Sequence, residues 1–593
     1  KLVFLVPSQN TSCDHMKGFT TLLVFSVAAG AVGYDYVVVG GGVAGSVVAT
    51  RLAATHSVLL LNIAGPPPTK YNAPVMTSDE LIVKSNLSAT PGMMTRIHQP
   101  GYNPVPQFST SDTGSSPARY LGGSSIVGLS LFLYDLDKDW APGWDWNIMQ
   151  NYMLRSDIQP THSPAYLHPL TKDFLKAVPE AKPTPLSQRP DGTKISAYAA
   201  YIVNKNPQRL TILENVRADR LIIEGGMCRG VYVRDLAKGG HRTIMAKNEV
   251  IVSAGYLFTP RLLFLSGIGD AKDLANADIE VVQDLPLVGK NLTAPRFTPI
   301  SWHTKTPTLS QMMGSPISKA QHPAVPEAFQ SAVAEATVPL RKGSIAQFMP
   351  LYYSPSSAPL QYSLQGEPWP LETNAFTVLV TMTTEAKGEI KFDRNPNVSP
   401  TITHAPLTAS DKRRGDEAIH AAEELGSRLP SEGRVKHTQD WSAVYDGRGT
   451  CRMGSDPRTS VVDTMLRVHG VRNLRIVDGS VLPSDTPYLA MPEVLMLAER
   501  AVDLILDVAT YSVKDLPLAT PLLAVVGGER ETSSNMAMAG ERERSSSTAM
   551  AISPWMVAVF AAIGVFFLLT GSYVVAFVNY RKTHAEADVY VQA

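Results

Sequence analysis

The chain of 593 residues carries 53 basic and 53 acidic side chains, so its formal net charge is zero. This balance gives no electrostatic reason to expect nucleic acid or another strongly charged partner, and it disfavours those function classes. Hydrophobic residues make up 44% of a chain far longer than one ordinary domain, so we expect a large core divided between two domains.

The N-terminal segment predicts a secretory signal peptide. Lys17 is followed by an apolar run over 19–27 and by small residues over 28–33, and we assign 16–33 to the signal. Residues 1–15 lie upstream of this pattern and are left out of the fold. A buried apolar helix is the alternative, but a strand pattern begins directly afterwards, as expected at the start of a mature chain.

Residues 36–65 read as a strand, a glycine turn, a helix and a second strand. Gly40, Gly42 and Gly45 stand at G-x-G-x-x-G spacing where a helix over 43–55 begins. Gly40 permits the tight turn, Gly42 lets the backbone approach a pyrophosphate, and Gly45 lets the helix pack closely on the strand. The segment predicts a dinucleotide site. The alternative is a glycine-rich turn of an unrelated α/β protein, unless distant segments agree.

Distant segments do agree. The following blocks occur in order: RYLGGSS from Arg119, PGWDW from Pro142, IVSAGYLFTPRLLFLSGIG from Ile251, GTCRMG from Gly449, LRVHGVRNLRIVDGSVLPS from Leu466 and MPEVLMLAERAVDLI from Met491. In this order and spacing they closely resemble the glucose-methanol-choline (GMC) oxidoreductase family, over about residues 34–506. The resemblance implies FAD rather than NAD as the cofactor.

The resemblance also implies an α/β fold in which a Rossmann-like FAD-binding domain is interleaved with an α+β substrate domain. We expect the FAD-binding domain to comprise 34–150, 210–292 and 446–506, and the substrate domain to comprise 151–209 and 293–445.

By the same resemblance, the FAD contacts are mostly glycines and small residues. The expected cofactor-binding positions are Gly40, Gly42, Val43, Ala44, Gly45, Asn62, Gly122, Gly123, Ser124, Ser125, Gly128, Ala218, Gly255, Asp478 and Gly479. An aspartate that forms a turn is the alternative interpretation of Asp478.

Several of these positions depart from the family pattern. Asn62 stands where the family ends its second strand with a glutamate that binds ribose hydroxyls; an amide still hydrogen-bonds a ribose, but without charge. Gly128 stands where the family commonly has asparagine. Val127 occupies the position at which covalently flavinylated members carry histidine, so we expect non-covalent FAD.

The expected catalytic positions depart most. The family has a histidine as base before Gly-Thr-Cys and a histidine or asparagine at the start of the last helix, and here these positions are Asp446 and Met491. A base for alcohol oxidation needs a pKa near the working pH, and an ordinary aspartate, at about 3.9, is too weak unless burial raises it. A thioether is at most a weak hydrogen-bond acceptor.

Arg448 places a cation where the family usually has an apolar residue. One interpretation is that Arg448 pairs with Asp446, which would lower the pKa of the aspartate. The other is that Arg448 points to solvent and Asp446 only caps a turn. His437 lies nine residues upstream of Asp446, whereas His404 and His469 lie in other segments, and each is interpreted as a satisfied or exposed histidine.

The C-terminal region predicts a membrane anchor. Residues 555–578 carry no charge, and 24 helical residues reach about 36 Å, enough to cross a hydrocarbon core of about 30 Å. Basic residues follow at once, which places the tail 579–593 in the cytoplasm, while 515–552 has the composition of a flexible stalk. Together with the signal peptide, this predicts a single-pass type I membrane protein with an extracellular or lumenal catalytic part.

Two smaller expectations concern modification and metals. Asn86, Asn291 and Asn397 fit the N-glycosylation pattern, which has meaning in a secretory chain. Cys13 precedes the predicted mature chain, so Cys228 and Cys451 could form at most one disulfide. The sequence shows no metal-ligand cluster.

The function that follows is a membrane-anchored, FAD-dependent oxidoreductase. It would act on the CH–OH group of a small-molecule alcohol, sugar or choline-like donor, with hydride transfer to the flavin. The alternative is a catalytically impaired flavoprotein scaffold or binding protein, because the family histidine and its partner are replaced by Asp446 and Met491. A non-alcohol chemistry, as in the fatty-acid photodecarboxylase branch that also lacks the histidine pair, would need a cysteine, and Met382 falls near that position.

Overall fold

The structure is a computed structural model, and its contacts divide the chain into two units, Lys1–Gly527 and Gly528–Ala593. All described residues belong to the first unit, and apart from short pieces they are 33–67, 119–127, 140–160, 169–187, 195–306, 374–398, 400–434, 441–443, 447–482 and 490–508. The predicted signal peptide up to residue 32, the stalk, the membrane span and the tail lie outside these residues, as do Asn86, Gly128, His437 and Asp446.

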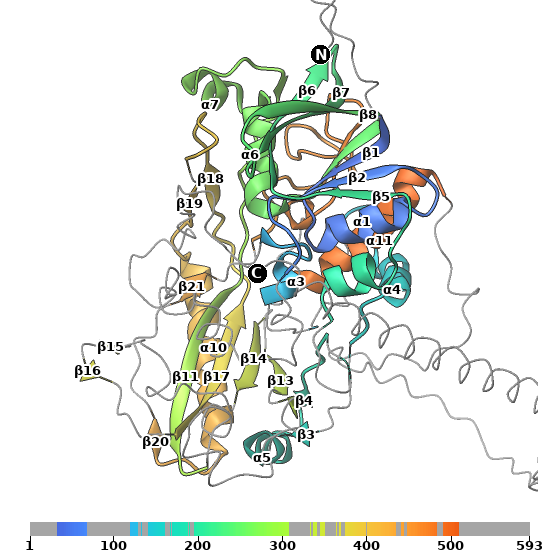
Figure 1. The fold of residues 1–593 in the computed structure, drawn as a ribbon. Helices are drawn as coiled ribbons and strands as arrows, with labels where there is room; N and C mark the ends of the chain where they lie inside the picture. The colour runs from blue at the N-terminus through green and yellow to red at the C-terminus, as the bar shows by residue number, and fades with distance from the viewer. Residues whose placement is uncertain are drawn as a thin grey trace, which may run out of the picture. The chain divides into compact units, whose positions relative to one another are not determined.

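A seven-stranded sheet, built from strands of both the N-terminal and the C-terminal part of the chain, forms the centre of one half of the fold (Figure 1). Its strand order is β5 (Leu210–Leu213), β2 (Val58–Leu61), β1 (Tyr34–Val39), β8 (His241–Val252), β7 (Met227–Asp235) and β6 (Val216–Glu224), and β22 (Leu474–Ile476) also pairs with β8. The pairs among β5, β2, β1, β8 and β22 are parallel, whereas β6, β7 and the first part of β8 form an antiparallel meander. This confirms the expected α/β fold with a Rossmann-like sheet.

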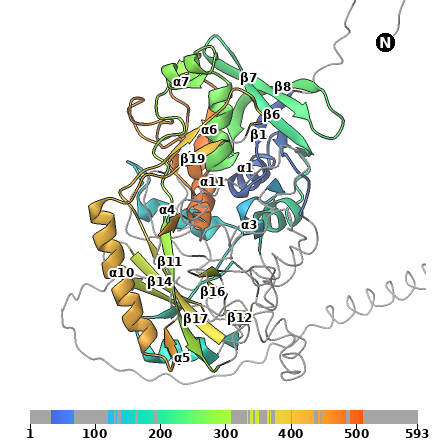
Figure 2. The same cartoon turned by 90° about the vertical axis from the view of Figure 1, so that its left-hand side faces the viewer.

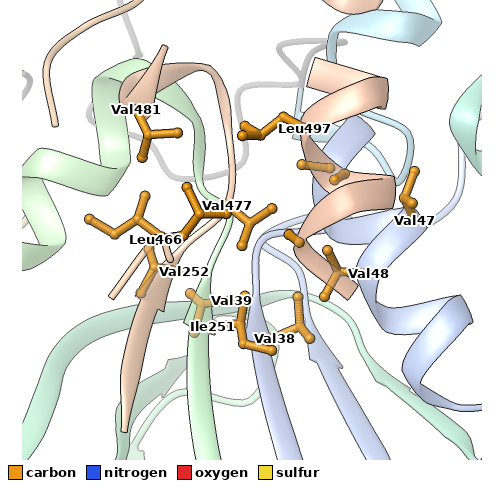
Figure 3. Close-up of a cluster of buried hydrophobic side chains, with 14 of the residues drawn as sticks. Val38, Val39, Val47, Val48, Ile251, Val252, Leu466, Val477, Val481 and Leu497 are labelled. Carbon is orange, nitrogen blue, oxygen red and sulfur yellow. The ribbon is translucent and has the colours of Figure 1, made fainter. Parts of the chain in front are cut away.

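Helices from both ends of the chain pack on this sheet. In Figure 1, α1 (Val43–Leu52) lies beside α11 (Met491–Leu506), and α4 (Trp146–Arg155) packs on α11. Most of the buried side chains around these helices are apolar, and Figure 3 shows Val48 of α1 and Leu497 of α11 in one cluster with the sheet residues. Burial of this continuous apolar surface holds α1 against β1, and the β-branched valines of β1 contribute to it.

One buried carboxylate ties these helices together. Glu499 of α11 is 0% exposed and accepts hydrogen bonds from Arg51 (Nη2, 2.8 Å) of α1 and Arg155 (Nε, 2.9 Å) of α4. The hydroxyl of Tyr201 in the π-helix η5 (Tyr198–Val203) donates a third, at 2.8 Å. A buried charge is tolerated only when it is paired, so this cluster holds α1, α4, η5 and α11 in one arrangement.

A second seven-stranded sheet lies in the other half of the fold. Its order is β20 (Gly433–Arg434), β11 (Arg296–Thr304), β17 (Asn374–Met382), β14 (Ser344–Met349), β13 (Ala336–Leu340) and β4 (Lys182–Pro183), with β21 (Ser442–Ala443) also paired to β11. Figure 2 shows α10 (Ala409–Ser427) along one face of it, and α10 begins with a capping box formed by Thr408 and Asp411. Ile419 and Ala422 pack there on Trp302 and Phe376.

The remaining elements are short. They are α3 (Ser124–Val127), α5 (Pro169–Ala177), α6 (Gly255–Leu265), α7 (Ala271–Asn276) and η8 (Gly479–Val481), with the strand pairs β3 (Tyr166–Leu167) and β12 (Ala332–Val333), β9 (Ile268–Gly269) and β10 (Gln283–Asp284), β15 (Ser363–Leu364) and β16 (Glu367–Pro368), and β18 (Glu389–Lys391) and β19 (Thr401–Thr403). Cys228 and Cys451 are both buried and reduced, and burial raises the pKa of Cys228 to about 12.

The membrane prediction has no counterpart among these elements. Within the described ranges, no helix combines the length and the apolar character needed to cross a bilayer.

Candidate functional site

The glycine turn follows β1 and leads into α1. A Cβ on Gly40, whose φ is +104°, would lie 2.4 Å from the carbonyl oxygen of Ser253, and a Cβ on Gly45 would lie 1.8 Å from that of Gly40. These two positions therefore need glycine for the turn and for close packing. A Cβ on Gly42 would meet no heavy atom within 4 Å, so this position borders open space.

The start of α1 offers hydrogen-bond donors to that space. Gly42 is the N-cap of α1 and supplies no side-chain cap, while Val43 and Ala44 begin the first turn. The first N–H groups of a helix have no acceptor within the helix, and the helix dipole favours negative charge there. The arrangement fits a pyrophosphate.

The block that begins at Arg119 packs directly on this turn. The N–H of Gly122 donates to the carbonyl of Gly41 at 2.7 Å, and a Cβ on Gly123 would lie 2.8 Å from the Cα of Gly42. Ser125 is buried and donates to the carbonyl of Gly122, whereas Ser124 is exposed. The structure therefore brings together two of the segments that the sequence placed at the cofactor.

Asn62, directly after β2, is committed to the backbone around the turn. Its Oδ1 accepts from the N–H of Gly41 at 3.0 Å, and its Nδ2 donates to the carbonyls of Ala64 at 2.7 Å and Arg119 at 2.9 Å. A carboxylate at this position could not make the last two bonds, because it has no donor.

Asp478 joins the end of β22 to the start of α6. One oxygen accepts from the N–H of Gly255 (2.9 Å) and the hydroxyl of Thr259 (2.5 Å), and the other accepts from the N–H of Ser480 (2.8 Å). Burial raises the pKa of Asp478, although these hydrogen bonds oppose the shift. Asp478 therefore does form a turn, and its hydrogen bonds fix the backbone at Gly255 and around Gly479. Ala218, also expected at the cofactor, lies half-buried at an irregularity in the pairing of β6 with β7.

The two expected catalytic positions lie on segments that a buried ion pair connects. Met491 is the first residue of α11 and is half-buried, and Asp446 lies outside the described residues. Arg448 is 0% exposed, and its Nη1 lies 2.6 Å from Oε2 of Glu493, which is 2% exposed, in the first turn of α11. The interpretation that Arg448 points to solvent is therefore wrong, because the glutamate provides the partner that burial of a guanidinium requires.

Further backbone contacts fix the loop around Arg448. The backbone groups of Arg448 and Thr293 exchange two hydrogen bonds, each of 2.9 Å. A Cβ on Gly447 would lie 2.5 Å from the ring of Tyr256, and the carbonyl of Tyr256 accepts from the hydroxyl of Thr450 at 2.7 Å. The loop is thus held by α6, by Thr293, which lies three residues before β11, and by α11.

Sequence reasoning missed Glu493 as a partner of this loop. A glutamate in the first turn of a helix is favourable for the helix dipole, so its sequence signal is that of an exposed residue. The position of Glu493 two residues after Met491, matching that of Arg448 two residues after Asp446, is the only signal that could have indicated the pair.

The histidines of the described residues differ in their surroundings. Nε2 of His469 lies 2.9 Å from the hydroxyl of Ser460 and 3.2 Å from the carbonyl of Gly454, so His469 is satisfied, as predicted. His404 is half-buried, and burial together with the charge of Arg296 lowers its pKa to about 4. No group of side chains in the described ranges could hold a metal ion.

Comparison with known proteins agrees with this geometry. Residues 34–295 and 384–498 match the two family models described as GMC oxidoreductase. Choline oxidase of Arthrobacter globiformis is 27% identical over 80% of this chain and 94% of its own length, and mitochondrial choline dehydrogenase of Mus musculus is 28% identical over 82% and 92%.

Solved structures share the fold. Pyridoxine 4-oxidase from Mesorbium loti has a TM-score of 0.63 at 22% identity, covering 79% of this chain and 98% of its own. Formate oxidase has a TM-score of 0.65 at 18% identity, covering 80% and 98%. At these identities the likeness shows the fold alone.

Proposed function

The chain belongs to the GMC oxidoreductase family and is an FAD-dependent enzyme, and from this premise we propose that it oxidises the CH–OH group of a small alcohol, sugar or choline-like donor. The flavin, when bound, accepts a hydride from the carbon of the donor. One observation carries the cofactor assignment: the glycine turn, the block at Gly122 and the Asn62 side chain are hydrogen-bonded to one another around Gly41.

We call the glycine turn at 40–45 together with the block at Gly122 the cofactor cradle. We assign different parts of the cofactor to different residues around it. Gly42, Val43 and Ala44 present backbone N–H groups to the pyrophosphate, and the turn that Asp478 orders with Gly255 and Gly479 would line the middle of the cofactor. No histidine is placed at position 127, which supports non-covalent FAD.

The hydroxyl proton of the donor needs an acceptor, and we assign this task to Asp446. Alcohol oxidation removes this proton while hydride leaves the carbon, and the base acts best with a pKa near the working pH. The loop that carries residue 446 and the helix that begins at Met491 are joined by Arg448 and Glu493, so these two positions would face the same reacting group. Because Arg448 is already neutralised by Glu493, it would lower the pKa of a nearby carboxyl less than an unpaired cation would.

A panel of donors tests the oxidoreductase proposal. The purified full chain, loaded with FAD, is mixed without oxygen with choline, primary alcohols, aldehydes and sugars, and the flavin absorbance near 450 nm is followed. We expect bleaching by at least one CH–OH donor. A protein that binds FAD and stays oxidised with every donor would instead support the scaffold alternative, which Met491 favours because it offers no strong hydrogen-bonding group.

We further propose that residues 16–33 act as a signal peptide and that residues 555–578 anchor the protein with its catalytic part outside the cytoplasm, with domain bounds as given by the sequence. The charge-free span and the basic residues Arg581 and Lys582 after it support this topology. An epitope after Ala593 should be accessible only in permeabilised cells, and one near Ser533 should be accessible from the outer or lumenal side. The reverse pattern would contradict the proposal.

A further inference from the structure

The amide of Asn62 has almost no capacity left for a ligand. Both protons of its Nδ2 are donated to the carbonyls of Ala64 and Arg119, and its Oδ1 already accepts from Gly41. One acceptor position remains, on a side chain that is 6% exposed. A dinucleotide site of this kind normally offers a carboxylate to the ribose hydroxyls from the end of the second strand. Asn62 cannot provide that group.

A carboxylate does occur at the end of the neighbouring strand. Glu214 follows β5, which runs parallel to β2 with Leu213 paired to Leu61. The N–H of Asn62 donates to the carbonyl of Leu213 at 2.9 Å, so Glu214 and Asn62 emerge side by side. The carboxyl ends of parallel strands form the edge of a sheet at which nucleotides bind.

The side chain of Glu214 is directed over the segment that follows Asn62. Its Oε2 lies 3.1 Å from the position that a Cβ on Gly65 would take, and the carbonyl of Gly65 accepts from the N–H of Leu121, at 3.1 Å. Glu214 is exposed, and within the described part of the chain its carboxylate has no hydrogen-bond or ion-pair partner. The absence of a side chain at Gly65 leaves room for the carboxylate beside the cofactor cradle.

Tyr198 connects Glu214 with the other wall of the cradle. Burial raises the pKa of Tyr198, and the negative charge of Glu214 raises it further. The Cβ of Tyr198 lies 3.0 Å from the position that a Cβ on Gly122 would take. The charge of the Glu214 carboxylate is therefore felt at Tyr198, next to the place where the Gly122 block packs on the glycine turn.

We propose that Glu214 supplies the carboxylate that accepts hydrogen bonds from the ribose hydroxyls in the adenosine half of FAD, while Asn62 serves to hold the surrounding backbone. The inference rests on FAD as the cofactor. It assigns the recognition of the ribose to β5 rather than β2, because the side chain that follows β5 is a carboxylate with both oxygens available as acceptors, whereas Asn62 has one acceptor position left and no charge.

Binding measurements on the apo form of the full chain test this assignment. Dissociation constants are measured by quenching of flavin fluorescence for FAD, for its 2′-deoxyadenosine analogue and for FMN, which lacks the adenosine half. Hydrogen bonds to charged groups are among the stronger ones, so Glu214→Gln should weaken FAD binding ~10- to 100-fold. It should leave FMN binding unchanged. The ratio of the affinities of the unmodified chain and the variant should be smaller for the analogue than for FAD, because the analogue lacks one of the two hydroxyls in question.

A matched control is Glu224→Gln, which changes another exposed glutamate, at the far end of β6, and should alter none of the three constants. Equal FAD affinity for Glu214→Gln and the unmodified chain would overturn the proposal. A parallel loss of FAD and FMN affinity would also overturn it, since that result indicates a structural effect. If the unmodified chain does not bind FAD at all, the assignment of FAD as the cofactor is wrong. This outcome can be told apart from the two outcomes above, in which the unmodified chain binds FAD.

Discussion

Arg448 and Glu493 form an ion pair of 2.6 Å in which the two side chains are 0% and 2% exposed. The pair joins the loop after position 446 to the first turn of α11, and it therefore connects the segments that carry the two expected catalytic positions, both of which depart from the family pattern. An isolated charge at this depth would be costly, whereas a pair of complementary charges is tolerated. The two substitutions are best understood together.

The first prediction concerns the stability of this pair. Glu493→Gln should lower the free energy of unfolding by about 3–5 kcal/mol, because it removes the carboxylate that pairs with a buried guanidinium. Arg448→Met combined with Glu493→Leu should lower it far less, since the unpaired charge is removed as well. Denaturant unfolding of the three proteins measures these differences. A double variant that is destabilised as much as Glu493→Gln, or more, would contradict the role of the ion pair.

The second prediction concerns the base. Asp446→His combined with Met491→Asn should speed reduction of the flavin by a suitable alcohol by ~10² to 10⁴, the usual contribution of a positioned base. The native Arg448 should be kept in this variant, because its replacement would remove the cation that pairs with the buried carboxylate of Glu493. Single-turnover reduction followed by absorbance measures the rate.

Two controls bracket that experiment. Adding Glu493→Gln to the double variant removes the negative charge beside Arg448, so the cation lowers the pKa of the new imidazole and should shift the acidic limb of the pH–rate profile, where the base becomes protonated, to lower pH. Asp446→Ala in the native chain tests the present base. If the native chain reduces its flavin rapidly and Asp446→Ala keeps that rate, the proton goes to a different residue.

The glycine turn could be predicted from the sequence, because its sterics are local. A strand, three glycines and a helix lie within a few residues of one another, and the observed contacts of Gly40 and Gly45 follow from that order. Even there, the helix ends at Leu52 rather than at residue 55, since helix ends carry little sequence signal.

The polar contacts of the site could not be predicted in the same way. Arg448 and Glu493 are 45 residues apart, and each has an ordinary exposed role in its own segment. Asn62 resembled a weakened ribose ligand because its partner Arg119 is 57 residues away and contributes only a backbone carbonyl. Such pairs depend on tertiary packing, which brings together groups whose local sequences carry no sign of each other.

The third prediction concerns acid stability and His404. Its pKa is lowered to about 4 by burial and by Arg296, whereas an unfolded histidine titrates near 6.5. The unfolded chain therefore binds the extra proton first, and stability falls as the pH drops from about 6.5 towards 4. The loss from this one group is at most about 3 kcal/mol.

His404→Gln should flatten the pH dependence of unfolding in that window while leaving the slope near pH 8 unchanged. The matched control is His420→Gln, on the exposed side of α10, which should keep the native slope. Thermal or denaturant unfolding between pH 4 and 8 gives both curves. An unchanged slope for His404→Gln would show that other groups account for the acid sensitivity.

The last prediction separates folding from cofactor binding within the glycine turn. A Cβ on Gly45 would lie 1.8 Å from the carbonyl oxygen of Gly40, so Gly45→Ala must displace α1 from β1 and should lower the stability of the apo protein by several kcal/mol, as overpacking does. A Cβ on Gly42 meets nothing within 4 Å, so Gly42→Ala should leave the apo protein about as stable as the native chain. The same methyl group would occupy the space that the pyrophosphate needs beside the first turn of α1, and Gly42→Ala should weaken FAD binding at least tenfold. Unfolding of the apo proteins and titration with FAD test both statements on the same samples, and a Gly42→Ala protein that binds FAD with native affinity would show that the phosphates do not lie against this turn.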